Sequence, residues 1–200
     1  SLARLRVLAT TRQAEQTKAV ALGLHGTRFA DSTGLSSTNV STAEDLATLV
    51  AHAHTYARIR EYSTMRQHEV EVTGRRLAYH NTNGLVSNPS WGIGLSKTGF
   101  INASGFNLAA SAVRDNRRLI GVVLGGPSAR TRDQYMGRLL DAAFARASGM
   151  PETREAALPY AGSKGGVQVA VSAPKAKQSA ASPKLVLKKQ EKPEMAMQAK

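Results

Sequence analysis

The 200 residues of the chain have the length of one ordinary domain, with or without a tail. Hydrophobic residues make up 42% and charged residues 20%, which excludes a fibrous or wholly disordered chain. The absence of cysteine excludes disulfide scaffolds, thiolate zinc sites and cysteine nucleophiles. A formal net charge of +13 makes nucleic acids, membrane surfaces and other anionic polymers candidate partners. No apolar run of about 18 residues and no signal peptide is recognisable, so the sequence predicts no membrane span.

The positive charge is concentrated towards the C-terminus. Residues 162–200 contain eight Lys and two Glu, and Ala170–Lys200 is mostly Ala, Ser, Lys, Pro and Gln. Such a segment buries too little apolar surface to offset the entropy of ordering. We therefore predict a folded part over residues 1–149 and a basic, Pro/Ala/Lys-rich flexible tail over residues 150–200.

The first elements in chain order are helical. Gln13–Leu24 has helical composition and ends at Gly23 or Gly26, and the Gly/Ser/Thr/Asn-rich segment His25–Val40 is typical of a loop. Ser41 and Glu44 have the spacing of a capping box, which predicts a helix from Thr42 to about Arg58. The predicted buried stripe of this helix consists of Leu46, Leu49, Val50, Ala53 and Ala57.

The next elements are strands. His68–Tyr79 alternates in hydrophobicity around Gly74 and is typical of a hairpin. Three further strands are expected at Trp91–Ile101, Gly105–Val113 and Leu119–Leu124, with a turn at Arg114–Arg117. Ser128 is placed to cap a last helix that ends at Gly149 and buries Met136, Leu139, Leu140, Ala143 and Phe144. This order predicts an α+β fold, an antiparallel sheet with flanking helices.

A Lys-Thr-Gly tripeptide lies within the first strand of the predicted sheet, at Lys97, Thr98 and Gly99. On an edge strand, Lys97 would present a cation to a hydroxyl or a carboxylate, and Thr98 would add a hydroxyl beside it. Gly99 has no side chain, so a ligand can approach the backbone closely. An open strand edge can also pair with an extended peptide.

The residues around this tripeptide carry a resemblance that extends from about residue 17 to 146. The matching stretches are Lys18–Phe29, Asp31–Ser36, Asn39–Leu46, Ile59–Thr64, Tyr79–Asn83, Gly94–Phe100, Ala103–Leu108 and Leu119–Gly126. With these stretches the chain resembles the serine D-Ala-D-Ala carboxypeptidases, the low-molecular-mass penicillin-binding proteins with a β-lactamase/transpeptidase-like domain. Carboxypeptidases and the related endopeptidases share most of the stretches, so the choice between these activities stays open.

The resemblance implies a serine peptidase of peptidoglycan metabolism that forms an acyl-enzyme, acts outside the cytoplasm, such as in the periplasm, and needs no cofactor. Its site combines an S-x-x-K, an S-x-N and a K-T-G motif. By position, Lys97 and Thr98 would bind the carboxylate of a stem peptide ending in D-Ala-D-Ala, and Gly99 completes the motif. The backbone amide of Phe100 would belong to the oxyanion hole. In full-length members of the family, β-lactams bind at the same site.

The chain departs from the family pattern in the first two motifs, which should precede Lys18. The one S-x-x-K is Ser172–Lys175, behind the K-T-G motif, and the one S-x-N is Ser37–Asn39, in a loop. Short motifs arise easily by chance, so we expect neither to be catalytic. The sequence therefore predicts the C-terminal half of a catalytic domain, with substrate-binding residues but no nucleophile or base. Such a half should expose an apolar face and be poorly stable.

The remaining features have ordinary structural interpretations. His52 and His54 are two positions apart on a helix and cannot both face one metal, so no metal site is expected. Trp91 is expected in the core, and Glu44 and Asp45 are explained as helix-start charges. His80–Asn83 is expected to form a polar turn or to shape a loop near the site. The tip with Arg114, Arg117 and Arg118 is expected to be solvated, or to contact an anionic polymer.

Two other functions stay open on sequence grounds. One is a non-catalytic remnant of the family. The other is a basic polyanion-binding protein, although aromatic residues make up only 5% and no specific nucleic-acid recognition motif is present. The basic charge also allows association with a membrane or cell-wall surface.

Overall fold

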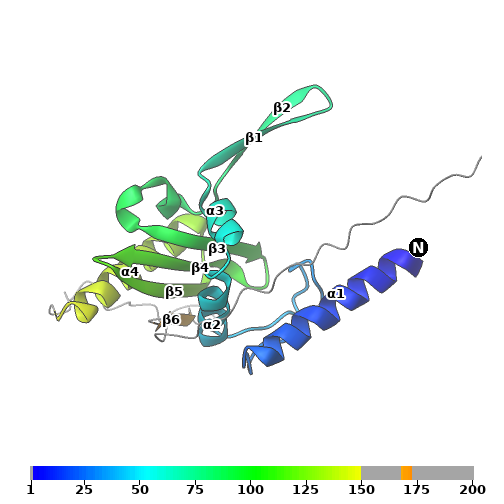
Figure 1. Cartoon of the computed structure of the whole chain (residues 1–200), viewed down its shortest axis with the longest axis horizontal. Helices are drawn as coiled ribbons and strands as arrows, with labels where there is room; N and C mark the ends of the chain where they lie inside the picture. Colours follow the sequence, from blue (N-terminus) through cyan, green and yellow to red (C-terminus); the bar gives the residue numbers. More distant parts are fainter. Residues whose placement is uncertain (1, 150–167, 173–200) are drawn as a thin grey trace, which may run out of the picture.

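A computed structural model of the chain describes residues 2–149 and 168–172, with side chains described from residue 11 to 149. Figure 1 shows the arrangement of the elements, a central sheet with helices around it and a separate hairpin. The helices are α1 (Leu2–Ala21), α2 (Ala43–Ala53), α3 (Ala57–Thr64) and α4 (Ala129–Ala147), with short 3-10 helices η1 (Gly84–Ser87) and η2 (Pro89–Trp91). The strands are β1 (Gln67–Val72), β2 (Arg75–His80), β3 (Ile93–Ile101), β4 (Gly105–Arg114), β5 (Arg117–Gly126) and β6 (Gln168–Ser172).

The central sheet is antiparallel and has the strand order β3-β4-β5-β6. Asp115 and Asn116 link β4 to β5 with positive φ angles of 48° and 59°, which short polar side chains tolerate. The three predicted strands and the turn between the last two are confirmed. The first strand begins at Ile93, because Trp91 belongs to η2 and Gly92 turns the chain with a φ of 60°.

Strand β6 falls inside the range predicted to be a flexible tail. It pairs with β5 between Ile120 and Leu124 and so satisfies backbone groups that the β5 edge would otherwise leave open. Its sequence, Gln-Val-Ala-Val-Ser, contains the β-branched residues that favour strands. The prediction of a tail missed this short strand, and the rest of the predicted tail lies outside the described residues.

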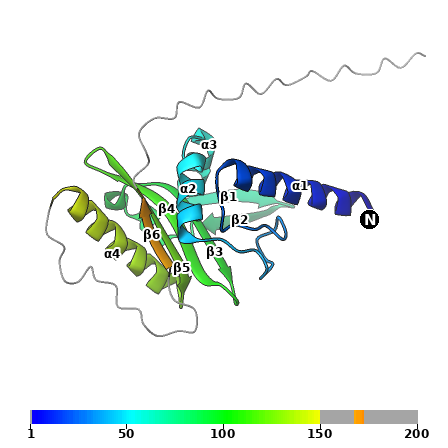
Figure 2. The same ribbon diagram turned by 90° about the horizontal axis from the view of Figure 1, so that it is seen from below.

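Helices cover both faces of the central sheet, which confirms the α+β fold class (Figures 1 and 2). Helix α4 covers one face, where the buried side chains include Leu108, Val123, Met136, Leu140 and Phe144. Helix α2 covers the other face, where they include Ala47, Val50, Leu95, Ile120 and Val122. The expectation of an exposed apolar sheet face was wrong for the described residues, because these two helices already bury both faces.

The predicted helix from Thr42 to Arg58 is two helices. Helix α2 ends at Ala53 and α3 begins at Ala57, so that α2 lies on β4 and β5 while α3 lies on β3. The cap is also one residue later than predicted: the Thr42 hydroxyl accepts from the Asp45 amide. Val50 is buried as expected, whereas Ala57 is exposed because it starts the second helix.

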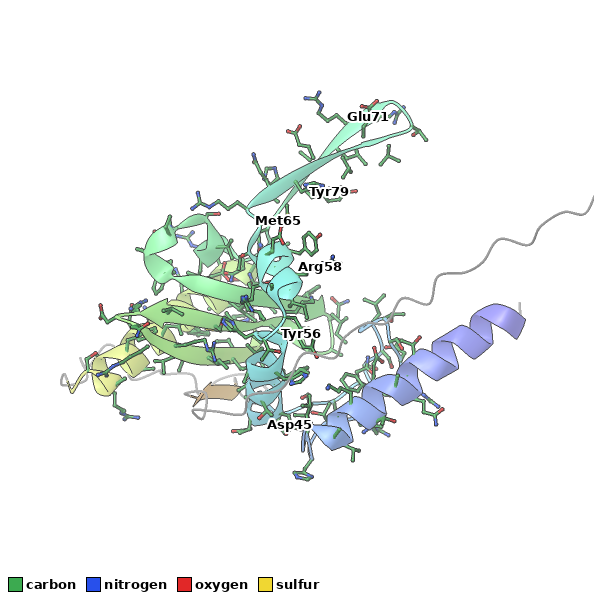
Figure 3. All side chains as sticks on the ribbon, viewed as in Figure 1. Asp45, Tyr56, Arg58, Met65, Glu71 and Tyr79 are labelled. Carbon is green, nitrogen blue, oxygen red and sulfur yellow. The ribbon has the colours of Figure 1, made fainter. Side chains whose placement is uncertain are left out.

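The predicted hairpin is confirmed and projects from the body of the molecule (Figures 1 and 3). Thr73 and Gly74 form its turn with positive φ angles of 49° and 73°. Its apolar positions share one face, where Leu77 is 40% and Tyr79 58% exposed. The hairpin is therefore held by its own strand pairing rather than by a core.

Helix α1 is longer than the predicted Gln13–Leu24. It ends at Ala21, two residues before Gly23, whose φ of 71° stops the helix as expected. Its side-chain links to the following loop include Gln16, which accepts from the Phe29 amide. No helix among the described residues is both long enough and apolar enough to cross a membrane.

Candidate functional site

The Lys-Thr-Gly motif lies on β3, the strand at the free end of the sheet order. Lys97 pairs with Ala109, Thr98 with Leu108 and Gly99 with Asn107, and no strand of the described residues lies beside the other edge of β3. Lys97 and Gly99 are exposed. The predicted position of the motif on the first strand of the sheet is confirmed, and this strand lies at an edge of the described sheet.

The backbone of β3 directs alternate amides towards the open edge. The Ser96 amide donates to the Ser63 hydroxyl of α3 at 3.3 Å, outside the sheet. In an antiparallel edge strand the outward amides recur at every second residue. The amides of Thr98 and Phe100 therefore also face the open edge, where a ligand can reach them. A Cβ built at Gly99 meets nothing within 4 Å, which shows that the space beside this residue is free.

The side chains of the motif lie on opposite faces of β3. The Lys97 ammonium is exposed and donates to the carbonyl of Thr98, so the cation lies against its own strand. The Thr98 hydroxyl lies 2.7 Å from the hydroxyl of Thr82, a residue of the segment His80–Asn83. The structure thus confirms that this segment shapes a loop beside the motif.

A buried arginine holds that loop in place. Arg132 of α4 is 2% exposed, and its Nη2 donates to the carbonyl of Thr82 at 2.7 Å. The same guanidinium forms a 2.7 Å ion pair with Asp133, whose other carboxylate oxygen accepts from the Gly84 amide at 2.9 Å. The charge of the buried arginine is thereby compensated, and α4 is tied to both sides of the loop.

Two asparagines complete the attachment of the loop. Asn83 is fully buried, donates to the Ser96 hydroxyl at 2.9 Å and accepts from the Leu85 amide at 3.0 Å. Asn81 donates to the carbonyls of Ser63 and Met65 at 3.1 and 2.9 Å. The loop is therefore bonded to β3, α3 and α4 at once.

A cavity of about 380 Å³ adjoins the motif at the end of β3. Among the residues with described side chains, no charged one lines it. Its polar groups are hydroxyls and amides, its apolar groups are aliphatic or aromatic, and the half-exposed Phe100 is one of them. The lining residues are Gly34, Ser36, Asn39, Val40, Ser41, Leu46, Gly99, Phe100, Ile101, Ser104, Asn107 and Leu124.

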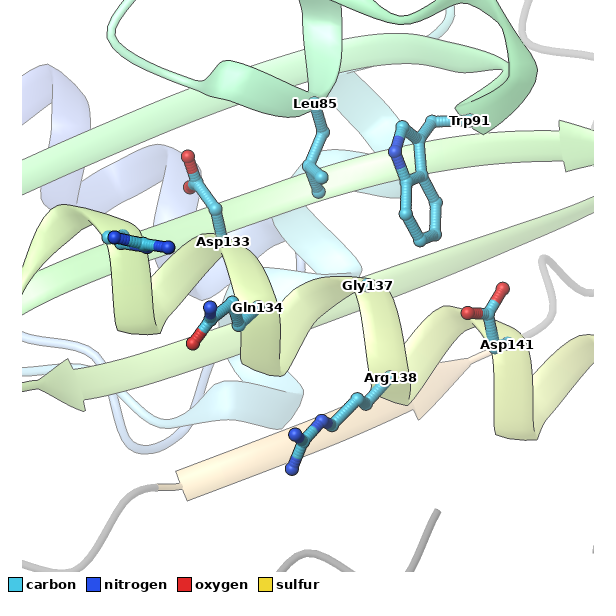
Figure 4. Close-up of a pocket in the computed structure, with 8 residues that line it drawn as sticks. Leu85, Trp91, Asp133, Gln134, Gly137, Arg138 and Asp141 are labelled. Carbon is cyan, nitrogen blue, oxygen red and sulfur yellow. The ribbon is translucent and has the colours of Figure 1, made fainter. Parts of the chain in front are cut away.

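A second cavity, of about 600 Å³, lies between α4 and the segment that contains η1 and η2 (Figure 4). Leu85 and Trp91 close one side of it and α4 residues from Arg130 to Asp141 form the other. The indole of Trp91 fits against Gly137, where a Cβ would approach the ring to 2.9 Å. Trp91 packs against the core cluster on the α4 side, which confirms its expected structural role.

The two histidines on the predicted helix have separate partners. His54 Nδ1 lies 3.0 Å from the hydroxyl of the fully buried Ser111, and His52 Nε2 lies 3.4 Å from the Tyr56 hydroxyl. Burial, with smaller contributions from the charges of Arg118 and Arg60, lowers the pKa of His54 below its usual range. Burial and then Lys18 lower the pKa of His52. Among the described residues, no group of three or more His, Cys, Asp or Glu is placed to hold a metal.

Of the two literal copies of the missing motifs, Ser172 lies far from β3, whereas Asn39 lines the cavity beside Gly99. Ser172 pairs with Ile120 at the far strand of the sheet, three strand spacings from β3 and thus roughly 14 Å away. Lys175 lies outside the described residues. The Asn39 side chain is used within its own loop, accepting from the Ala30 amide and donating to Asp31. Hydrogen bonding by Asn39 lowers the pKa of Asp31.

The arginine cluster at the β4–β5 turn is only partly a solvated tip. Arg114 forms a 2.6 Å ion pair with Asp141 and lies over the rings of Trp91 and Phe144, at 5.0 and 4.8 Å from their centroids. The expectation was therefore wrong for Arg114, which packs between the sheet and α4. Arg117 is exposed as expected.

Sequence reasoning missed the function of Arg132 and Asp133 at this site. Arg132 precedes Met136 and Leu140 at four-residue steps on α4, within the buried stripe. A charged residue in an apolar stripe is a signal that it has a buried partner. The partner itself, the Thr82 carbonyl 50 positions earlier, follows only from the tertiary structure.

Comparison with protein families gives the class of the protein. Residues 13–128, more than half of the chain, match the family model described as D-alanyl-D-alanine carboxypeptidase. The chain belongs to this family of hydrolases, the D-alanyl-D-alanine carboxypeptidases.

Individual relatives agree with this assignment. The chain is 40% identical over 114 residues to the D-alanyl-D-alanine endopeptidase of Escherichia coli K12, covering 56% of this chain and 37% of that protein. It is 35% identical over 125 residues to the D-alanyl-D-alanine carboxypeptidase DacA of Escherichia coli K12, covering 62% and 30%. The chain thus spans between a quarter and a half of the length of these curated relatives.

A solved structure agrees as well. The crystal structure of the Streptomyces K15 DD-transpeptidase superposes with a TM-score of 0.60 and 29% identity, covering 65% of this chain and 52% of that one. The resemblance and the partial fold expected from the sequence are confirmed.

Proposed function

We propose that the chain carries the carboxylate-recognition part of a D-alanyl-D-alanine peptidase site. Its ligand is a peptidoglycan stem peptide ending in D-Ala-D-Ala, and β-lactams bind the same strand. The observation that carries this proposal is the open edge of β3, with an exposed Lys97, the Thr98 hydroxyl and the outward amide of Phe100.

Each residue of the motif has one role in this proposal. The Lys97 ammonium attracts the terminal carboxylate, and Thr98 donates a hydrogen bond to it. The free space at Gly99 lets the peptide backbone approach, and the Phe100 amide stabilises the oxyanion as charge develops on the scissile carbonyl. An extended peptide adds main-chain hydrogen bonds to the β3 edge.

We further propose that none of the 200 residues supplies the nucleophilic serine or its lysine base. This is supported by the position of Ser172 on the far strand and by the use of the Asn39 side chain within its own loop. A non-catalytic remnant stays an alternative, as does polyanion binding through the basic charge. Because the proposed substrate belongs to the cell wall, the site of action is outside the cytoplasm.

Endopeptidase action is the second candidate activity. The identity to the relative named an endopeptidase is 40% over 114 residues, against 35% over 125 residues for DacA. The uncharged cavity beside Gly99 offers room for more of a peptide than two D-alanines. Comparing peptides that end in D-Ala-D-Ala with cross-linked peptides, in the same binding assay, separates the two substrate preferences.

A titration followed by amide NMR tests the proposal. The ligands are diacetyl-L-Lys-D-Ala-D-Ala and its C-terminal amide. The peptide acid should perturb the backbone amide signals of residues 97–100 and should bind more tightly than the C-terminal peptide amide. Lys97→Ala should weaken binding of the peptide acid roughly tenfold.

Arg117→Ala is the matched control, because it removes an exposed cation from the turn between β4 and β5. It should leave the affinity unchanged. Equal affinity of the wild-type chain for acid and amide, or equal losses in the two variants, would contradict the proposal.

A further inference from the structure

We propose that Thr82 is a positioning residue that orients the hydroxyl of Thr98 for carboxylate recognition. The inference rests on the proposed function of the Lys-Thr-Gly motif and assigns to the preceding loop a part in it. It starts from the 2.7 Å separation of the two hydroxyl oxygens, the length of a good O–H···O hydrogen bond.

The direction of this hydrogen bond decides what Thr98 can offer a ligand. A hydroxyl has one proton and two lone pairs. If Thr98 donates to Thr82, its proton is used and it can only accept from a ligand. If Thr82 donates to Thr98, the Thr98 proton is free. A carboxylate only accepts hydrogen bonds. Its binding therefore selects the hydrogen-bond arrangement in which Thr82 donates to Thr98 and Thr98 donates to the ligand.

Thr82 is held rigidly enough to fulfil this role. Its carbonyl accepts from the buried Arg132, and Asp133 fixes the Gly84 amide two residues later. Asn83, next to Thr82, donates to Ser96 on β3 itself. The loop therefore keeps the Thr82 hydroxyl in register with the Lys-Thr-Gly strand.

The proposal predicts a larger effect on acidic ligands. The ligand with a C-terminal amide in place of the acid carries N–H donors. Thr98 can accept a hydrogen bond from such a donor while it donates to Thr82. Loss of the Thr82 hydroxyl should therefore weaken binding of the acid more than binding of the amide, because only in the acid complex does the Thr82 donor strengthen a charge-assisted hydrogen bond from Thr98. A residue that only packs against the strand would affect both ligands equally.

The experiment uses the whole chain and the two peptides named above. Thr82→Val keeps the shape but removes the hydroxyl, and it should weaken binding of the acid roughly three- to tenfold and binding of the amide by less. Thr82→Ser restores the hydroxyl and should restore the affinity. Combining Thr82→Val with Thr98→Val should cost no more than Thr98→Val alone.

The amide spectrum of each variant establishes whether it is folded, and Thr82→Ala replaces Thr82→Val if the valine disrupts the loop. Equal losses for acid and amide, no rescue by Thr82→Ser, or additive losses in the double variant would overturn the inference. In another outcome, the wild-type chain binds the acid more tightly than the amide, Lys97→Ala weakens binding of the acid, and Thr82→Val binds both peptides like the wild-type chain. This outcome would overturn the inference and leave the proposed function intact. A wild-type chain that does not discriminate acid from amide would overturn both.

Discussion

Arg132 shows how much of this site depends on a single buried charge. Its guanidinium ties Thr82 and Asp133 together below the loop that adjoins the Lys-Thr-Gly strand. Removal of one partner of a buried ion pair leaves the other uncompensated, at a cost of several kcal/mol. The arginine therefore contributes both to stability and to the geometry of the site.

Arg132→Ala should lower the free energy of unfolding by roughly 3 kcal/mol, because Asp133 and the Thr82 carbonyl lose their partner. Urea denaturation measures this loss. Arg130→Ala is the control: this exposed arginine lies two residues earlier on α4, and its loss should cost less than about 0.5 kcal/mol. Equal effects of the two substitutions would show that the buried contacts of Arg132 are not stabilising.

His54 should make the stability of the fold depend on pH. Burial, Arg118 and Arg60 lower its pKa in the folded chain, so the unfolded chain binds a proton at a higher pH than the folded chain does. The free energy of unfolding is therefore fully retained above about pH 6.5 and falls as the pH drops towards the lowered folded pKa.

His54→Gln should flatten this decline, since glutamine does not titrate. His52 adds a decline of the same direction, because its pKa is also lowered, so some slope should persist. Urea midpoints measured from pH 7.5 to 5 report the difference. A variant with the same pH dependence as the wild-type chain would exclude His54 as its source.

At the level of helices and strands, the sequence predicts the structure where a local pattern decides it. The buried stripe of α4, the hairpin turn at Gly74 and the strand with Lys97 follow from spacing and turn chemistry. The break between α2 and α3 was missed, because each helix follows a different part of the sheet. The Thr82–Thr98 contact was missed because it joins two segments through the tertiary fold.

Gly92 offers a test of the entry into β3. Its φ is 60°, and a Cβ there would lie 2.2 Å from the Val113 carbonyl oxygen, a backbone atom that cannot move aside easily. Gly92→Ala should therefore lower the free energy of unfolding by roughly 3 kcal/mol or more, combining backbone strain and overpacking.

Gly74→Ala separates the two causes. Gly74 has a similar φ of 73°, but no atom lies within 4 Å of its Cβ position. It should show only the strain, roughly 1–2 kcal/mol, in thermal or urea denaturation. If the two variants lose equal stability, the close approach of Gly92 to β4 is not what restrains that position.

At the scale of the molecule, the sheet and the two helices that cover it should unfold as one unit. Ile120 is fully buried on the α2 face, while the single tryptophan, Trp91, reports on the α4 face. Ile120→Ala should cost about 2–5 kcal/mol and shift the transition by fluorescence and by far-UV circular dichroism alike. Separate transitions, with only circular dichroism shifted, would show that the two faces are not coupled.

We propose that the chain recognises a carboxylate on β3 and supplies no nucleophile of its own. The most direct test is an amide NMR titration with benzylpenicillin, followed by dialysis and an intact mass. We expect perturbation of the amides of Thr98, Gly99 and Phe100 that dialysis reverses, with an unchanged mass. No perturbation of these amides, or a mass increase of one penicillin per chain that survives dialysis, would contradict this proposal.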